Sequence, residues 1–402
     1  MKPPVPRTLT QVLAHHASTF RQMAFVVGPR QVGKTTVCSS FQPAARTFNW
    51  DDEDHRRVIT RGTAAIADEL GLARLHEGRQ VVVFDELHKY RRWRTFLKGL
   101  FDRHSADLSI VVTGSSRLDF YRKGGDSLMG RYFDHRLHPL SVGELVDPAP
   151  LDDVLRPPRP IADDAWGRLL QHGGFPEPFV HADHRFSLRW QKLRREQLVR
   201  GDIRDLTRIQ EVDQVELLVR HLESRSATQI EYAALARDVR VSADTLRRWI
   251  EALQSLYHGF LLRPWFTNVA RSLRKEPKWY LRDWSHIADR GARVETFVAC
   301  HLLKAVETWE DAGLGEFKLH FLRDKDRREV DFVVVRDGAP WFLIEVKASD
   351  DALSPALGHF QRQLGAPHAF QLVIDAPYVD VDPFTRREPC SVPARTLLSQ
   401  LP

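Results

Sequence analysis

The chain has 402 residues, a net charge of +6 and an apolar content of 43%. This length is too great for one hydrophobic core and predicts two or three domains of ordinary size. No stretch reaches the roughly 18 uncharged apolar residues of a membrane span, and the amino terminus lacks an apolar signal sequence, so we expect a cytoplasmic protein without membrane contact. Cys38, Cys300 and Cys390 stand far apart, which argues against a disulfide framework and a zinc site.

The first strong motif is a phosphate-binding loop. An apolar strand, Ala24–Val27, precedes a turn that fits GxxxxGK[ST], and a helix follows. Glycines let backbone N–H groups surround phosphate oxygens, while the lysine reaches the terminal phosphates and the Ser/Thr hydroxyl binds magnesium. We therefore expect ATP and Mg²⁺, with Thr35 as a metal ligand. The expected nucleotide-binding residues are Gly28, Pro29, Arg30, Gln31, Val32, Gly33, Lys34, Thr35, Thr36, Asp85 and Ser115.

A second stretch predicts the other half of this site. Four apolar residues, Val81–Phe84, predict a buried parallel strand that ends in Asp85 and Glu86. Sheets of this class bind ligands at the carboxyl ends of their strands. Asp85 would hold magnesium through water, and Glu86 would orient or deprotonate the water that attacks the phosphate. The alternative is that the two acids only cap the strand.

The next apolar strand, "LSIVVTGSSRLDF", ends in polar residues. Thr113, Ser115 and Ser116 resemble the sensor that touches the γ-phosphate or the attacking water in AAA ATPases, although that sensor is more often asparagine. Arg131, in "GDSLMGRYF", is a candidate charge-neutralising arginine, acting in its own chain or on a neighbouring subunit. The alternative for Arg131 is an ordinary surface arginine.

The middle of the chain is basic and mainly helical. Val146–Asp164 holds five prolines, so it predicts a domain boundary or the hinge of a lid. Arg185–Arg282 carries 20 Lys+Arg against 12 Asp+Glu, and a basic region of this kind can face nucleic acid. A solvated helical surface would explain the same charge.

Within this basic region, a short helix, a tight turn and a second helix predict a helix-turn-helix with a following β wing. The turn lies at Arg240 and Val241, and Ser242 is a good N-cap. Apolar residues recur at helical spacing at Leu246, Trp249, Ile250, Leu253, Leu256 and Tyr257. Arg247 and Arg248 lie off this stripe and could meet DNA phosphate. Winged helices also serve as protein contact modules, and that alternative stays open.

Asp331 and Glu345 stand inside two apolar stretches that predict a β-hairpin. Because side chains alternate along a strand, the length of the loop decides whether the two acids share a face. A two-residue turn would point Glu345 away, whereas a three-residue loop over 337–339 would place it directly opposite Asp331. We predict the three-residue loop, since Gly338 suits its left-handed position, and Lys347 then joins the same face.

Two carboxylates beside a lysine match a metal-dependent nuclease site, where the acids hold Mg²⁺ or Mn²⁺ and the lysine positions water or offsets phosphate charge. Glu295 lies in the apolar stripe of an upstream helix, where a carboxylate needs a partner. Asp331 and Glu345 are the predicted metal ligands, Glu295 a further one, and Lys347 completes the catalytic set. The alternative is a retained fold in which the acids and the lysine form a structural ion pair.

The chain resembles, almost end to end, the prokaryotic AAA ATPases with a carboxy-terminal domain of unknown function related to PD-(D/E)xK nucleases. Nine blocks carry the likeness, although Val330 replaces the proline of the nuclease motif. They are "GPRQVGKTT", "VVVFDELHK", "VTGSSRLDF", "SLMGRYFDHRLHPLSVGEL", "GGFPEP", "RGDIRDL", "KEPKWYLRD", "ETFVACHLL" and "EVDFVVV…IEVKAS". The resemblance implies an ATP-binding module, a helical lid, a winged helix and a nuclease-like end.

The predicted fold class is α/β, in four parts. Residues 1–147 would form a P-loop AAA ATPase core with a parallel sheet, 148–225 a helical lid or linker, 226–283 a winged helix, and 284–402 a nuclease-like domain of αβββαβ order. The predicted function is ATP binding and hydrolysis coupled to action on DNA, with cleavage by the last domain. The rival function is an ATP-switched DNA- or protein-binding module whose last domain is inactive; a homo-oligomer or a partner protein fits either.

Overall fold

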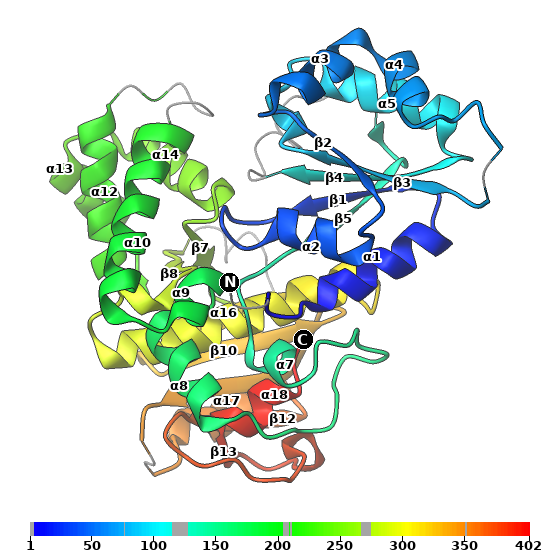
Figure 1. Cartoon of the computed structure of the whole chain (residues 1–402). Coiled ribbons are helices and arrows are strands. Elements are labelled where there is room, and N and C mark those ends of the chain that lie inside the picture. The colour runs from blue at the N-terminus through cyan, green and yellow to red at the C-terminus, as the bar shows by residue number, and fades with distance from the viewer. Residues whose placement is uncertain are drawn as a thin grey trace. The chain divides into compact units, whose positions relative to one another are not determined.

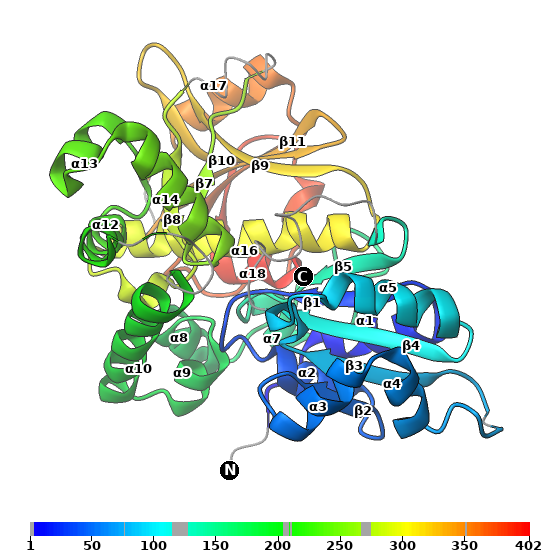
Figure 2. The ribbon, with the colours of Figure 1, turned by 90° about the horizontal axis from the view of Figure 1, so that it is seen from above.

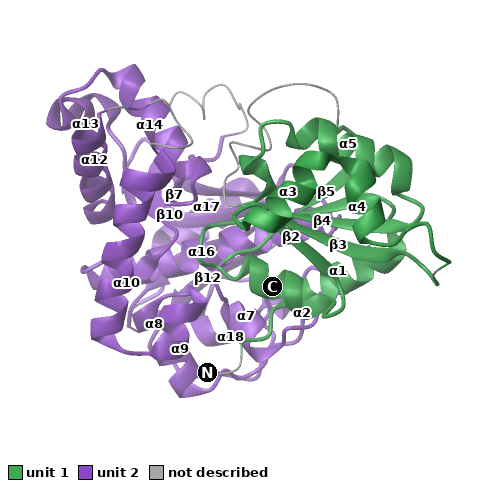
Figure 3. Ribbon diagram, turned by 45° about the horizontal axis from the view of Figure 1, so that its top comes forward, with its two compact units in different colours: residues 1–138 green, residues 139–402 purple. Residues whose placement is uncertain are grey.

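The structure is a computed structural model (Figure 1), and it describes residues 4–75, 77–114, 128–203, 209, 211–266, 275–349 and 352–402. The chain divides into two compact units, residues 1–138 and 139–402 (Figure 3). Within the described ranges, no helix is both long enough and apolar enough to cross a membrane.

The first unit is built on a five-stranded sheet of order β2-β3-β4-β1-β5, and every neighbouring pair is parallel. Its strands are β1 (Met23–Val27), β2 (Arg46–Asn49), β3 (Gln80–Asp85), β4 (Leu108–Gly114) and β5 (Tyr132–Arg136). Every residue of β1 and β4 is buried, as expected of inner strands covered on both faces. The prediction of an α/β fold with a parallel sheet is therefore confirmed.

Helices cover both faces of this sheet, and Figure 1 shows α3, α4 and α5 on one side and α1 and α2 on the other. They are α1 (Thr8–Thr19), α2 (Lys34–Phe41), α3 (Glu53–Arg61), α4 (Thr63–Glu69) and α5 (Trp93–His104). Aromatic side chains fill the layer beneath α3 to α5, with Phe48 stacked on Phe84 and Phe96 set edge-on against Phe84. This packing fixes β3, which carries the two predicted acids at its end.

The second unit begins with helices and a small sheet. The helices are α7 (Val142–Val146), α8 (Asp163–His172), α9 (Pro176–His181), α10 (His184–Glu196), α12 (Val212–Ser224), α13 (Tyr232–Val239) and α14 (Ala243–Ser255). A three-stranded antiparallel sheet of order β6-β8-β7 follows, made of β6 (Thr228–Gln229), β7 (Gly259–Leu262) and β8 (Lys278–Leu281). Within the proline-rich stretch 146–164, residues 147–162 form neither helix nor strand.

The first predicted boundary, at 147/148, falls after the division that the structure shows at 138/139. The physical reason is that α7 packs within the second unit. Lys304, on the long helix α16 (Arg290–Asp311), donates to Glu144 of α7 at 2.6 Å and to Ser141 at 2.8 Å, and both ion-pair partners are buried.

The turn between α13 and α14 follows the prediction closely. Arg240 takes a left-handed conformation with φ of 61°, and the side chain of Ser242 accepts the N–H of Thr245 as an N-cap. The apolar stripe of α14 is buried, so the helix is held by one face. Arg247 and Arg248 are exposed on its other side.

The carboxy-terminal part is a mixed sheet of order β13-β12-β11-β10-β9. Its strands are β9 (Phe317–Arg323), β10 (Glu329–Arg336), β11 (Ala339–Lys347), β12 (His368–Val373) and β13 (Cys390–Pro393). Figure 2 shows α16 and α17 (Pro355–Leu364) on opposite faces of this sheet, and the last helix is α18 (Ala394–Ser399). The predicted order of one helix, three strands, a helix and a strand is observed.

The hairpin of β10 and β11 corrects one prediction. Its loop has two residues, because Arg336 pairs with Ala339 across Asp337 and Gly338, which both have positive φ. The three-residue loop is therefore wrong. The register still shifts by one residue between Val334 and Val335, where a β-bulge adds the missing residue on β11. Phe332 then pairs with Ile344, and Asp331 and Glu345 are the next residues beyond this pair on the two strands.

Candidate functional site

The loop between β1 and α2 has the backbone that a phosphate-binding loop requires. Gly28 has φ of 158°, and a Cβ there would lie 2.3 Å from the carbonyl oxygen of Leu137, so only glycine fits. Gly33 has φ of 100° immediately before Lys34, the first residue of α2. The amino end of α2 therefore follows directly from the loop, where its dipole favours an anion.

Lys34 is held at this loop before any phosphate arrives. Its side chain is 7% exposed, and its Nζ donates to the carbonyl oxygens of Gly28 at 3.0 Å and Pro29 at 2.8 Å. Burial lowers the pKa of Lys34 to about 8, although Glu86 and Asp85 act in the opposite direction. A buried ammonium with only carbonyl partners is well suited to meet phosphate oxygens.

Asp85 joins the two halves of the predicted site. Its carboxylate is buried, and the hydroxyl of Thr35 donates to Oδ2 at 2.9 Å while the hydroxyl of Thr113 donates to Oδ1. Hydroxyl and carboxylate oxygens are the hard ligands that Mg²⁺ prefers, so Thr35 and Asp85 fit this ion when it arrives with a nucleotide. Bound Mg²⁺ would neutralise phosphate charge here.

Glu86 has an unusual backbone at the carboxyl edge of the sheet. Its φ is 54°, a left-handed conformation that costs a non-glycine residue on the order of 1–3 kcal/mol. The side chain is 20% exposed and lies 3.3 Å from Nζ of Lys89, which also pairs with Asp51 at 2.6 Å. This arrangement fixes a carboxylate one residue beyond Asp85, where a water-activating group would have to lie.

Three further predicted residues, at the end of β4 and beyond it, have different outcomes. Ser115 and Ser116 lie outside the described residues. Thr113, in the same predicted group, is fully buried and binds Asp85, so its hydroxyl is directed to the acid and not to solvent. Its position at the end of an apolar strand was the signal for this contact.

Arg131 does not reach the nucleotide loop of its own chain. It precedes β5, which runs parallel to β1 with Tyr132 opposite Met23, and its carbonyl oxygen accepts the N–H of Met23. The loop follows the other end of β1, so Arg131 lies at the opposite edge of the sheet. Its guanidinium pairs with Asp102 on α5 at 2.7 and 3.2 Å. The direction of β5 therefore rules out the alternative in which Arg131 acts on the nucleotide of its own chain.

Arg7 is a buried residue of this site that the sequence did not reveal. Its guanidinium donates to the carbonyl oxygen of Val32 in the loop at 2.8 Å and to that of His138 at 2.5 Å. These bonds tie the loop backbone to the segment that follows β5. No local pattern marks such an arginine, because these two acceptors are backbone atoms 25 and 131 residues away.

The second predicted site also forms, around a group that we call the acidic cluster: Glu295, Glu329, Asp331 and Glu345. Asp331 accepts the backbone N–H of Val346 at 2.8 Å, and Glu345 accepts Nζ of Lys347 at 3.1 Å. Glu295 accepts the hydroxyl of Tyr280 at 2.7 Å. Asp331, Glu345, Lys347 and Glu295, all predicted to meet, are thus brought together by α16 and the hairpin.

A lysine that the sequence analysis overlooked lies in the middle of this cluster. Lys278, on β8, has a side chain 6% exposed, and its Nζ lies 2.5 Å from Glu329, 3.1 Å from Glu295 and 3.9 Å from Asp331. The ring of Phe321 closes another side, with its centroid 5.5 Å from Nζ. A charged residue at the start of an apolar strand, "KWYL", was the signal that could have identified it.

Burial and neighbouring charges shift the pKa values of three side chains in the cluster. Burial raises the pKa of Asp331 well above its usual range, and the carboxylates of Glu295 and Glu345 add to this effect. Burial also raises the pKa of Glu345, while the Lys347 ammonium opposes it. Burial alone would lower the pKa of Lys278, but Glu295, Asp331 and Glu329 together raise it. The ammonium form of Lys278 is therefore strongly favoured.

This donor set does not fit a divalent cation, because the Lys278 ammonium already contacts three of the four carboxylates. In the described ranges, no group of three or more His, Cys, Asp and Glu side chains has an arrangement that could hold a metal ion. The predicted metal roles of Asp331 and Glu345, and the expectation of Mn²⁺, thus gain no support from the geometry.

The parallel sheet, the loop after β1 and the acids after β3 define a P-loop nucleotide-binding domain. Residues 20–146 match the AAA domain family, so this part of the chain is an AAA-type domain. Two domains of unknown function match the remainder, DUF8612 over residues 163–288 and DUF4143 over residues 290–376. Neither of these two descriptions includes a nuclease or a winged helix.

The chain is similar to two uncharacterized proteins, from Mycobacterium bovis and Mycobacterium tuberculosis, each 25% identical over 354 residues that cover 83% of this chain and 72% of the relative. Among solved structures it is similar to a Walker-type ATPase of Pyrococcus abyssi, with a TM-score of 0.41, 12% identity, and coverage of 74% of this chain and 99% of that one. The ORC1 protein of Aeropyrum pernix in complex with DNA follows, with a TM-score of 0.32, 16% identity, and coverage of 72% and 90%.

Proposed function

We propose that the chain is an ATP-hydrolysing protein that acts on DNA as a nucleotide-switched binding module. The observation that carries the ATPase part is the contact between Thr35 and Asp85, which joins the phosphate-binding loop to the acid-bearing strand at 2.9 Å. In this proposal, Lys34 binds the phosphates of ATP, Thr35 and Asp85 hold Mg²⁺, and Glu86 activates the attacking water. The AAA-type domain over residues 20–146 agrees with this assignment.

Replacing Asp85 with asparagine should lower the rate of Mg²⁺-dependent ATP hydrolysis on the order of 100-fold, because the amide keeps the shape but removes the charge beside the metal. The measurement is phosphate release by the full chain. Asp107→Asn, a change at the amino edge of β4, is a suitable control for a general loss of charge. Hydrolysis by Asp85→Asn at the parental rate would contradict the ATPase site proposed here.

The DNA part of the proposal is supported by the order α12, β6, α13, α14, β7 and β8, which is the order of a winged helix. Arg247 and Arg248 are exposed on α14, the helix that would meet the major groove. Arg248 donates to Thr245 at 3.2 Å, and Arg247 stacks on Tyr232 with its guanidinium carbon 4.9 Å from the ring centroid. Both arginines are thus oriented at the surface, where backbone phosphates could pair with them.

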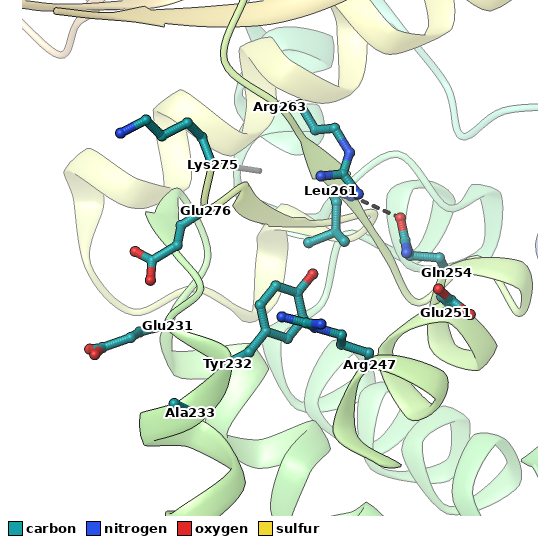
Figure 4. Close-up of a pocket in the computed structure, with 10 residues that line it drawn as sticks. All are labelled: Glu231, Tyr232, Ala233, Arg247, Glu251, Gln254, Leu261, Arg263, Lys275 and Glu276. Atoms are coloured by element: carbon teal, nitrogen blue, oxygen red, sulfur yellow. Dashed lines mark hydrogen bonds between the residues drawn. The ribbon is translucent and has the colours of Figure 1, made fainter. Parts of the chain in front are cut away.

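An observation on the same surface favours the protein-contact alternative. A cavity of about 750 Å³ lies beside Tyr232. Its lining, drawn in Figure 4, includes Arg247, Arg263 and Lys275 but also three glutamates. The glutamates come from the start of α13, from α14 and from the segment before β8. A lining with both charges suits a peptide better than a phosphate backbone, so DNA must be tested against it.

The double change of Arg247 and Arg248 to alanine should weaken DNA binding and reduce the slope of log Kd against log salt by about 2, roughly one for each lost phosphate contact. Fluorescence anisotropy with labelled duplex DNA at several salt concentrations measures both effects. Arg189 and Lys192, exposed on α10, form a matched control pair of equal charge. If both double changes weaken DNA binding equally, α14 has no specific role in it. If the parent chain binds no DNA at all, the result favours the alternative in which this surface contacts a protein.

The second candidate function is the phosphodiester cleavage expected from the sequence. The observation in its favour is that Asp331, Glu345 and Lys347 lie close together, with Oε2 of Glu345 buried and without a hydrogen-bond partner. Incubation with single-stranded, duplex and branched DNA in Mg²⁺ or Mn²⁺ tests it. Cleavage that disappears in Asp331→Asn would support this function, whereas intact DNA supports the binding module.

A further inference from the structure

The acidic cluster combines side chains from two sheets and a helix around one ammonium group. Glu295 comes from α16, Glu329 and Asp331 from β10, and Lys278 from β8 of the smaller sheet. The backbone of Lys278 lies between two neighbouring strands, since it pairs with Gln229 of β6 and with Leu262 of β7. Its Nζ therefore enters the cluster from a rigid central strand, at 2.5 to 3.9 Å from three carboxylates.

The acids of the cluster find their counter-charges within the chain itself. Lys278 forms ion pairs with Glu295 and Glu329. Arg323 pairs with the second oxygen of Glu329 at 3.3 Å. Lys347 pairs with Glu345 at 3.1 Å. Asp331, the remaining acid, accepts the backbone N–H of Val346 at 2.8 Å and lies 3.9 Å from Nζ of Lys278. Buried carboxylates are tolerated when cations lie close to them, and each acid of this set lies within 3.9 Å of a lysine Nζ.

We propose that the Lys278 ammonium is the resident cation of the acidic cluster and holds the place that a divalent metal ion would need. The space is closed from other sides by the Phe321 ring and by Tyr280, which donates to Glu295. An entering Mg²⁺ or Mn²⁺ would have to expel a buried ammonium and break at least two ion pairs. The ion pairs of the cluster therefore hold β8 against α16 and β10. They do not support metal-dependent chemistry. This inference extends the proposed binding role of the second unit.

The first test uses the full wild-type chain, free of nucleotide so that the ATP site contributes no metal binding. Electron paramagnetic resonance of Mn²⁺ titrated with the protein should show no bound ion at millimolar metal, and Mn²⁺ should leave the Tm unchanged. Mn²⁺ binding that disappears in Asp331→Asn would overturn the proposal, because it would mean that Lys278 moves aside for metal. So would Mn²⁺-dependent DNA cleavage lost in the same variant.

The second test removes the ammonium. Lys278→Met should lower the Tm by about 10 °C, because buried carboxylates lose their counter-charge in an otherwise similar volume. The matched control is Lys318→Met on β9, a lysine paired with Glu316 at the exposed surface, which should leave the Tm within about 2 °C. An unchanged Tm in Lys278→Met would overturn the proposal.

Two more variants keep the test decisive if Lys278→Met fails to fold. The double change Lys278→Met and Glu329→Gln removes one charge of each sign, so it should recover most of the lost Tm if charge balance is the role of Lys278. Lys278→Ala leaves room for a hydrated ion, and Mn²⁺ should raise its Tm although it does not raise that of the wild type. A double change as unstable as the single one, together with no Mn²⁺ effect on Lys278→Ala, would contradict the inference. ATP hydrolysis and DNA binding are measured separately, so their failure would leave this result untouched.

Discussion

Lys34→Ala should abolish tight ATP binding, with an increase in Kd of about 100-fold or more. The reason is that the buried ammonium, held by the carbonyl oxygens of Gly28 and Pro29, is the group that offsets phosphate repulsion inside the loop. Truncating one partner of a buried charge pair costs roughly 2–5 kcal/mol, and each 1.4 kcal/mol is a factor of ten. Isothermal titration with ATP and Mg²⁺ measures the change directly.

Lys34→Arg is the informative companion of this variant. It keeps the charge but replaces a compact ammonium with a planar guanidinium, which cannot occupy the same position between two carbonyl oxygens. We expect it to bind ATP more weakly than the parent. A thermal melt of both variants separates a lost ligand contact from a lost fold. ATP binding by Lys34→Ala with the parental Kd would contradict the assignment of the loop.

The nucleotide site could be predicted almost completely because its determinants are local. The glycines, the lysine and Thr35 are contiguous, and the requirement for glycine at 28 and 33 follows from backbone conformations that the motif itself implies. Asp85 could be added because a buried parallel strand must end at the same edge of the sheet as β1. The position of Arg131 relative to the loop of its own chain could not be predicted, since only the direction of β5 shows that this residue precedes a strand and does not follow one.

The acidic cluster could be predicted only in part, because it depends on long-range packing. The three-residue loop was wrong, but a β-bulge supplied the residue that the turn lacked, so Asp331 and Glu345 both follow directly on the Phe332–Ile344 pair. Trp341 is the extra residue of the bulge, and its ring packs against Trp309 and Phe317. No sequence pattern indicates such packing. Lys278 was overlooked because it belongs to a different sheet, so nothing in the hairpin sequence indicates that a cation enters from β8.

Glu86→Gln should separate nucleotide binding from hydrolysis. The side chain of Glu86 follows the metal-side acid directly, and its left-handed backbone, together with Lys89 at 3.3 Å, fixes its direction. Glutamine keeps this shape but cannot accept a proton, so ATP hydrolysis should fall 10²- to 10⁴-fold, the usual contribution of a general base. The Kd for ATP should change by less than about threefold, because Glu86 is expected to act on water and not on the nucleotide.

Single-turnover hydrolysis and equilibrium ATP binding, measured on the same preparation of Glu86→Gln, check the two halves of this prediction. Glu69→Gln is the matched control, since Glu69 is an acid of the same unit that pairs with Arg46 at the surface and lies on α4, away from the loop. It should hydrolyse ATP at the parental rate. If Glu86→Gln also hydrolyses ATP normally, the strained backbone at residue 86 serves only to position Lys89 and Asp51, and another group must activate the water. If it loses binding together with hydrolysis, Glu86 stabilises the loop through the charge of Lys34, which the same titration would detect as a weaker Kd.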